Sequence, residues 1–332
     1  MLIFNNNPHI FPLYQRALSL MISKDLADEK GGKISLSEKQ HSEQENSRRE
    51  LLAVEEEAKQ DKMIEEYGRI HFKEQMMSQF LEQVTNKVNN DFDHKEVLYA
   101  NEARIDNTAS NILEILTLKA ASINKIAPLV QSLPWLSDEL INLVNKPQYR
   151  KRSDVKVTEN HLALSYVGLD NLKLVMPTFM LKSWLPTTTT PYPLLKRKLW
   201  NNSLSVALTT KVLANKYKLD EFSAFIAGLF SNIGATIISK SVLETFNEML
   251  KDELKDAYDN RDKRLHDVLT EFEMSPDILL TQITERQTQM SADIVELMRF
   301  DRLAITEPLF DLAIIDDIEK MHPIAQIITK AK

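Results

Sequence analysis

A histidine precedes an aspartate at His266 and Asp267, and such a pair can hold a metal ion that activates water for hydrolysis. The surrounding residues, NRDKRLHDVLTEFE, are charged and contain no glycine, which favours a solvated helix face over a metal centre. A second acidic group, Asp316 and Asp317 with Glu319, lacks the loop geometry that converges oxygen ligands on a cation. We therefore predict no metal site and no cofactor.

Two basic triplets offer a different chemistry, the binding of an anion such as a phosphate group. They are Arg150, Lys151 and Arg152, and Lys196, Arg197 and Lys198. An exposed loop and an exposed first helical turn explain these charges without a ligand, and this interpretation is favoured. A nucleotide-sensing domain that uses both triplets remains an alternative.

Composition limits the fold and the function. The 332 residues are 43% hydrophobic, and only 6 are glycine, which favours helix over sheet and predicts an all-α protein. The absence of cysteine excludes disulfides and thiolate metal sites and fits the reducing cytoplasm. The net charge of -7 argues against binding to DNA. No stretch approaches the roughly 18 uncharged apolar residues that cross a bilayer, so we expect no membrane span and a cytoplasmic protein.

The chain divides into an N-terminal segment and two helical lobes. Residues 25–50 are polar and predict a linker or a solvated helix, whereas residues 50–90 predict an amphipathic helix that packs on the main domain, in preference to a coiled coil. Helical segments are expected near 108–130, 136–146, 159–184, 194–217, 220–230, 234–257 and 276–300. Prolines in WLPTTTTPYP, residues 184–193, end the first lobe. The predicted domains are residues 1–105, 106–190 and 191–332.

Residues 199–238 resemble the centre of HDOD domains, the helical signalling branch of the HD phosphohydrolase superfamily. The family pattern joins a Trp-x-His-Ser helix to an Ala-rich helix and a Gly-Leu-Leu-His-Asp-Ile-Gly helix end. The resemblance extends loosely over residues 120–320. The positions that fit it are Asn145, Gly168, Trp200, Ser203, Gly228 and Gly234. It implies a multi-helix bundle in two lobes, preceded by charged amphipathic helices.

The same resemblance places three residues where the family's active relatives carry metal ligands. These are Asn202 in place of the first histidine, and Ser231 and Asn232 in place of the His-Asp pair. Neutral amides and a hydroxyl bind transition metals weakly and supply no charge to compensate the cation. We expect these side chains to hydrogen-bond among themselves and to cap helix ends in a buried pocket.

The resemblance implies a role in signal transduction. The leading hypothesis is a non-catalytic bacterial scaffold, a pseudoenzyme that contacts protein partners through its N-terminal helices or the groove between its lobes. Its vestigial pocket is a candidate site for a small ligand, and homo-oligomerisation is left open. The alternative from another class is a phosphohydrolase whose metal site is rebuilt from His266, Asp267 and the pair Asp316 and Asp317.

Overall fold

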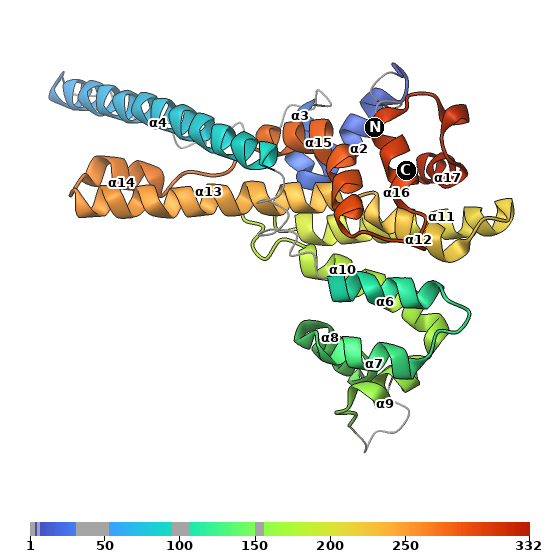
Figure 1. The fold of residues 1–332 in the computed structure, drawn as a ribbon. Helices are drawn as coiled ribbons and strands as arrows, with labels where there is room; N and C mark the ends of the chain where they lie inside the picture. The colour runs from blue at the N-terminus through green and yellow to red at the C-terminus, as the bar shows by residue number, and fades with distance from the viewer. Residues whose placement is uncertain (1–3, 5–6, 31–52, 95–106, 150–155) are drawn as a thin grey trace.

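The computed structural model describes residues 4, 7–30, 53–94, 107–149 and 156–332. Within 53–94, side chains are described from residue 62 onward. These residues form helices and no strand (Figure 1), which confirms the predicted all-α class. The triplet from Arg150 to Arg152 lies outside the described residues, so its predicted role stays a prediction.

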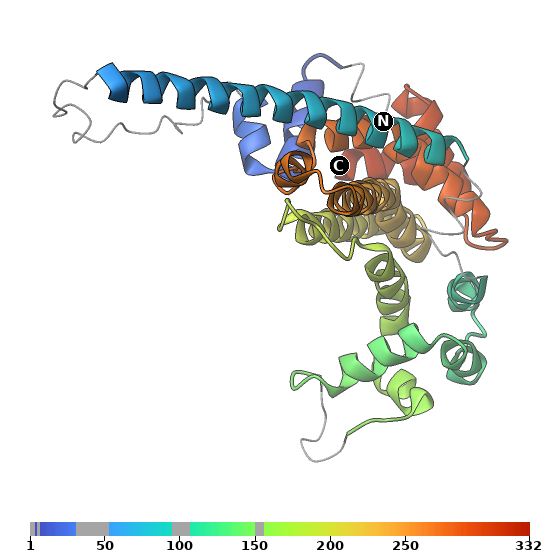
Figure 2. The same ribbon diagram turned by 90° about the vertical axis from the view of Figure 1, so that its left-hand side faces the viewer.

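The first lobe is built from five consecutive helices that pack against one another. They are α6 (Asn107–Thr117), α7 (Ile123–Gln131), α8 (Pro134–Asn145), α9 (Asn160–Val167) and α10 (Leu169–Trp184). Figure 2 shows this lobe hanging below the rest of the molecule. Helix α10 also contacts α12 and α13 of the second lobe, so it joins the two.

The second lobe surrounds two long helices, α11 and α13. Its elements are α11 (Leu195–Tyr217), α12 (Glu221–Phe230), α13 (Ile233–Asp259), α14 (Lys263–Leu269), α15 (Pro276–Leu297), α16 (Thr306–Ile314), the short 3₁₀ helix η3 (Ile318–Lys320) and α17 (Pro323–Ala331). Helix α15 packs along α13, whereas α17 packs on α11 and α12. The apolar core is continuous between the lobes.

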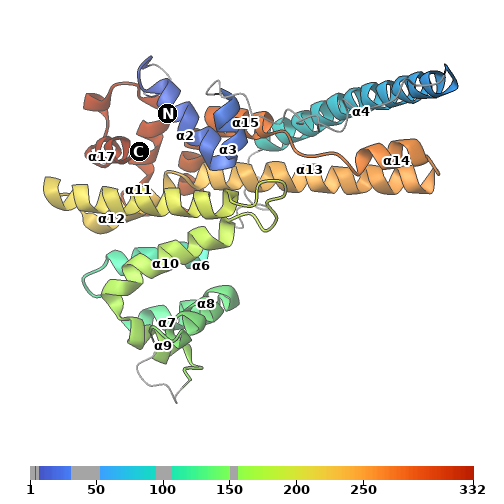
Figure 3. The ribbon, with the colours of Figure 1, turned by 180° about the vertical axis from the view of Figure 1, so that it is seen from behind.

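The N-terminal helices cover the second lobe. Helix α2 (Phe11–Ile22) packs on α15 and α11 and is followed by α3 (Lys24–Lys30), as Figure 3 shows from behind. Helix α4 (Ala53–Asp93) packs its C-terminal part on α13 through Phe80, Val84 and Val88, which confirms the predicted amphipathic helix. Its N-terminal part projects away from the other helices (Figure 2).

Two segments that the sequence predicts as continuous helices are broken. Helix α6 ends at Thr117, and Ser122 is extended before α7 begins. Gly168 interrupts the segment 159–184 because its φ of 76° and ψ of 154° are far from helical values. Asn145 links the end of α8 to the residues before α9, since its side chain accepts from Val157 N at 2.9 Å and donates to Val157 O at 2.7 Å. Both are positions of the family pattern.

The prediction that no stretch is long and apolar enough to cross a bilayer is wrong as far as length and composition are concerned. One stretch within Glu221–Asp259, which contains α12 and α13, has a mean hydropathy of 1.6 over 18 residues. That window is 94% buried inside the protein, because α12 and the first half of α13 form the centre of the core. Hydropathy therefore reflects core burial here.

We expect replacement of Gly168 by alanine to lower the free energy of unfolding by about 1–3 kcal/mol, because residues with a side chain rarely adopt its backbone conformation. Gly68→Ala is the matched control, since a methyl group at this position on α4 meets no atom within 4 Å. The control should raise stability by up to about 1 kcal/mol. Urea unfolding of both variants tests this, and equal effects would contradict it.

Candidate functional site

The three positions that the resemblance assigns to metal ligands come from three helices. Asn202 lies on α11, whereas Ser231 ends α12 and Asn232 immediately precedes α13. Ser231 and Asn232 are buried, with exposed fractions of 1% and 4%. Asn202 and Asn232 line one cavity of about 370 Å³, so the family frame still brings them together.

The start of α13 is held by an unusually close approach to α15. A Cβ atom at Gly234 would lie 2.0 Å from Gln287 O, a distance that no side chain tolerates. The Gly234 N–H donates to Ser291 Oγ at 2.9 Å, and the Ser291 hydroxyl is within 3.2 Å of Ser231 O. Ser291, on the neighbouring helix α15, therefore accepts a hydrogen bond from a backbone N–H in the first turn of α13, which has no acceptor within its own helix.

The expected hydrogen bonds among the small polar side chains are not formed. Ser231 Oγ instead donates back to Gly228 O at 2.9 Å, within its own helix. Asn232 makes no capping hydrogen bond, and its buried Nδ2 has no partner. The predicted capping is therefore found at the end of α12, where Ser231 satisfies Gly228 O, but is wrong for Asn232, because Ser291 accepts from the first turn of α13.

The ammonium group of Lys332 lies beside Asn202, Ser231 and Asn232. Lys332, directly after α17, donates from Nζ to Ser231 O at 3.1 Å and lines the same cavity as Asn202 and Asn232. The residue as a whole is partly exposed, but its ammonium is buried. This burial lowers the pKa of the ammonium from the ordinary 10.5 to about 7.

The rest of the cavity comes from α2, α11 and α15. Lys198 on α11 donates from Nζ to Leu20 O of α2, and burial, followed by the charge of Arg197, lowers its pKa. Gln287 Nε2 donates to the Tyr14 hydroxyl, which links α15 to α2. Burial raises the pKa of this hydroxyl above its ordinary value. The remaining lining residues are Ala17, Leu18, Leu20, Met21 and Asn201.

This set of side chains does not fit a catalytic divalent metal. Imidazole or carboxylate donors are needed to hold such an ion and acidify its water, and Asn202, Ser231 and Asn232 offer neither. A protonated Lys332 adds a positive charge that repels a cation. Across the described ranges, no group of three or more His, Cys, Asp or Glu side chains converges as a metal site.

The candidates for a rebuilt metal site lie far apart. His266 and Asp267 are on the exposed helix α14, with Nδ1 and Oδ1 3.9 Å from each other. Asp317 begins η3, where it accepts from Glu319 N, and the hydrogen bond from Lys320 lowers its pKa. Helix α14 and the segment between α16 and α17 occupy opposite ends of the second lobe in Figures 1 and 3.

The other positions of the family pattern serve packing. A Cβ atom at Gly228 would lie 3.0 Å from Ala207 Cα, so this glycine allows α12 to approach α11. Trp200 is half-buried against the core, and Ser203 is buried with its hydroxyl unpartnered. In the second basic triplet, Lys196 and Arg197 are exposed and only Lys198 lines the cavity.

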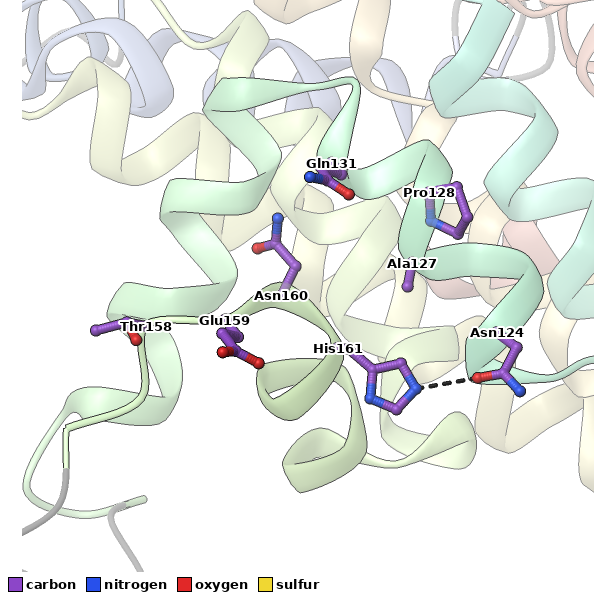
Figure 4. A pocket seen from close by; sticks show the side chains of 8 residues that line it. All are labelled: Asn124, Ala127, Pro128, Gln131, Thr158, Glu159, Asn160 and His161. Carbon is purple, nitrogen blue, oxygen red and sulfur yellow. Dashed lines mark hydrogen bonds between the residues drawn. The ribbon is translucent and has the colours of Figure 1, made fainter.

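A second cavity, of about 540 Å³, opens in the first lobe between α7 and the start of α9 (Figure 4). His161 Nε2 lies 3.0 Å from Asn124 Oδ1 at one end of it. Its other lining residues are Ala127, Pro128, Gln131, Thr158, Glu159 and Asn160. Most of the side chains that line this groove are polar.

Sequence reasoning missed Lys332, Ser291, Gln287 and Tyr14, which come from segments far from the family motif. For Lys332 a signal was present. Ile324 and Ile328 are buried at helical spacing, and a lysine four residues later falls on the same inward face. No comparable pattern marks Ser291, since its role depends on the approach of α15 to Gly234.

The lowered pKa of Lys332 predicts a change of stability with pH. Between pH 7 and 10.5 the unfolded chain holds a proton on this lysine that the folded protein has released, so raising the pH favours the folded state. Wild-type protein should therefore gain free energy of unfolding relative to Lys332→Met across this window. Urea unfolding at several pH values measures the difference. Lys330→Met, an exposed neighbour, should follow the wild type, and a pH-independent difference for Lys332→Met would refute the assignment.

Comparison with protein-family models matches residues 103–274 to the HDOD domain. An HDOD domain protein of unknown function from Geobacter sulfurreducens is 17% identical, with 68% of this chain and 70% of that one covered and a TM-score of 0.42. A protein from Shewanella amazonensis SB2B, provisionally described as a metal-dependent phosphohydrolase, is 16% identical over 77% of this chain and 81% of its own (TM-score 0.44).

A protein from Marinobacter aquaeolei VT8, provisionally described as a signal transduction protein, is 16% identical over 68% of this chain and 47% of its own (TM-score 0.45). No curated protein matches the chain. The family match covers more than half of the sequence and includes the frame around Asn202, Ser231 and Asn232. The chain therefore belongs to the HDOD domain family.

Proposed function

We propose that this chain is a non-catalytic signal-transduction protein of the bacterial cytoplasm that acts through contacts with protein partners. The observation that carries the proposal is the state of the vestigial site. The frame that once presented metal ligands is retained, but Asn202, Ser231 and Asn232 stand at the ligand positions and the Lys332 ammonium lies beside them. A helix arrangement that is retained without metal-ligating side chains favours a role in binding and signalling.

Electrostatics supports the loss of hydrolysis. A divalent ion next to the protonated ammonium of Lys332 would meet repulsion that water screens poorly in a partly buried cavity. No carboxylate side chain lines the cavity to compensate the charge of such an ion. The rival phosphohydrolase would need His266 and the pair Asp316 and Asp317 to meet, and these residues belong to opposite ends of the lobe.

The N-terminal part of α4 supports a partner that contributes a helix. Met77, Leu81 and Val84 face the protein body, and the same heptad positions continue outward as Met63, Tyr67 and Ile70. The three outer side chains are exposed by 62%, 74% and 49%, so an apolar stripe extends beyond the surface that buries it. An amphipathic helix of another protein would continue the interface that α4 forms with α13.

The absence of metal-dependent hydrolysis is tested by metal content and thermal unfolding. We expect purified protein to carry no stoichiometric metal and to show no shift of Tm with Mn²⁺, Fe²⁺, Zn²⁺ or Mg²⁺. A metal that binds only the folded state, at 100 times its dissociation constant, would stabilise by about 2.7 kcal/mol and be detected. Bound metal together with phosphatase activity that disappears in His266→Ala would establish the rival instead.

Contact with a partner is tested by a photo-crosslinking amino acid at position 67 in living cells. The expected product is one discrete adduct with a different protein, because Tyr67 is the most exposed residue of the stripe. The same amino acid at Tyr149, exposed by 57% on the first lobe, is the matched control and should give no such adduct. An adduct between two copies of this chain, or equal adducts at both positions, would count against the proposed partner.

A further inference from the structure

The cavity next to the vestigial site is positively charged. Lys198 enters it from α11, and Lys332 enters it from the end of α17. None of the side chains that line it is a carboxylate. Two ammonium groups that share one cavity repel each other when both are protonated, and an anion between them removes that cost.

Both ammonium groups retain protons to donate. Each one carries three N–H bonds. Lys198 uses one of them for Leu20 O, and Lys332 uses one for Ser231 O. Because both acceptors are neutral backbone carbonyls, neither lysine has a charged partner in the cavity. The remaining protons are available for charge-assisted hydrogen bonds to an anion.

A deeper donor is also unsatisfied. Asn232 is only 4% exposed and lines the cavity, and its Nδ2 has no hydrogen-bond partner. A buried donor without a partner lowers stability, so such groups in folded proteins usually have an acceptor. Asn232 also precedes the first turn of α13, a helix of 27 residues whose N-terminal end carries partial positive charge. An anionic acceptor would satisfy the amide and would lie near the partial positive charge of this helix end.

The opposite wall of the cavity is apolar. Ala17, Leu18 and Met21 of α2 face the polar side formed by α11, α13 and α17. A cavity of about 370 Å³ falls within the range that proteins use for small ligands. The combination suits a molecule with one anionic group and a compact, less polar remainder.

We propose that this cavity binds a small phosphate-bearing molecule, with its phosphate held by Lys198, Lys332 and Asn232. A phosphate presents three terminal oxygens and up to two negative charges to these three donors, whereas a carboxylate presents two oxygens and one charge. The inference rests on the proposed function, since a phosphate that is held without a catalytic metal is bound as a signal and is not hydrolysed. It also names the ligand class that the vestigial pocket would take.

The test measures binding of inorganic phosphate and AMP to the full chain by titration calorimetry at constant ionic strength. Lys332→Gln and Lys198→Gln should each weaken both probes about tenfold, the effect of losing one charge-assisted hydrogen bond. The matched controls are Lys330→Gln and Lys196→Gln, which remove the same charge from exposed positions on the same two helices. Both controls should bind like wild type, and Lys332→Arg should retain binding.

A second measurement does not depend on the folding of the variants. In wild-type protein, phosphate should shift the NMR signal of the Asn232 side-chain amide and leave that of Asn124, in the other lobe, unchanged. Failure of both probes to bind, equal losses in the control variants, or acetate binding as tightly as phosphate would each overturn the proposal.

Hydrolysis separates this inference from the proposed function. Release of phosphate from bound AMP would leave the site in place but refute the non-catalytic role. Absence of both binding and hydrolysis would refute the site alone. The two failures are therefore distinguishable in the same set of samples.

Discussion

The approach of α13 to α15 at Gly234 is the constraint on which the rest of the second lobe depends. With Gln287 O only 2.0 Å from where a Cβ atom would be, the two helices are in contact through their backbones. The Ser291 hydroxyl then reaches both Gly234 N and Ser231 O, so one side chain of α15 fixes the whole turn between α12 and α13. That turn positions Asn232, and Gln287 on the same face of α15 reaches Tyr14 of α2. Helix packing and cavity geometry therefore have a common origin.

Four positions of the family pattern have structural roles in this fold. Gly228 and Gly234 allow close approach of neighbouring helices, Asn145 bonds to the backbone of Val157, and Gly168 adopts a positive φ between two helices. None of these four roles requires a metal ion. Among the three positions that the resemblance assigns to metal ligands, Ser231 takes part in the turn between α12 and α13. Asn202 is exposed, and the Asn232 Nδ2 has no partner. Asparagine at positions 202 and 232 is therefore compatible with an intact core.

Much of the fold could be predicted from the sequence because apolar spacing reports which face of a helix is buried. That signal locates α8, α11, α12, α13 and α15 within a few residues of their observed ends. It does not mark the break at Ser122, where both flanking segments keep helical periodicity and only the local backbone changes. At Gly168 the glycine itself was visible, but a glycine within an apolar pattern is also compatible with a continuous helix.

The candidate site was predictable only where it coincides with a motif. Alignment with the family pattern places Asn202 and Asn232 correctly at one cavity. It does not identify the lining residues that come from outside the motif, such as Lys332 or Tyr14, because only tertiary packing brings them to the cavity. The basic triplet at Lys196 illustrates the same limit. The sequence shows three adjacent charges, and only the helix geometry determines that Lys198 points to the cavity while its neighbours face solvent.

Helix α4 has a mechanical consequence that follows from its length of 41 residues. At about 1.5 Å per residue, its first residue lies about 40 Å along the axis from Phe80, where the helix is firmly packed. A tilt of about 5° at that point would displace the far end by about 3.5 Å, so a small rotation there would become a larger displacement at the end of the helix. Glu271 opposes such a tilt, because it pairs with Lys73 at 2.7 Å and with Arg69 one turn further out. Loss of this one carboxylate would remove both ion pairs at once.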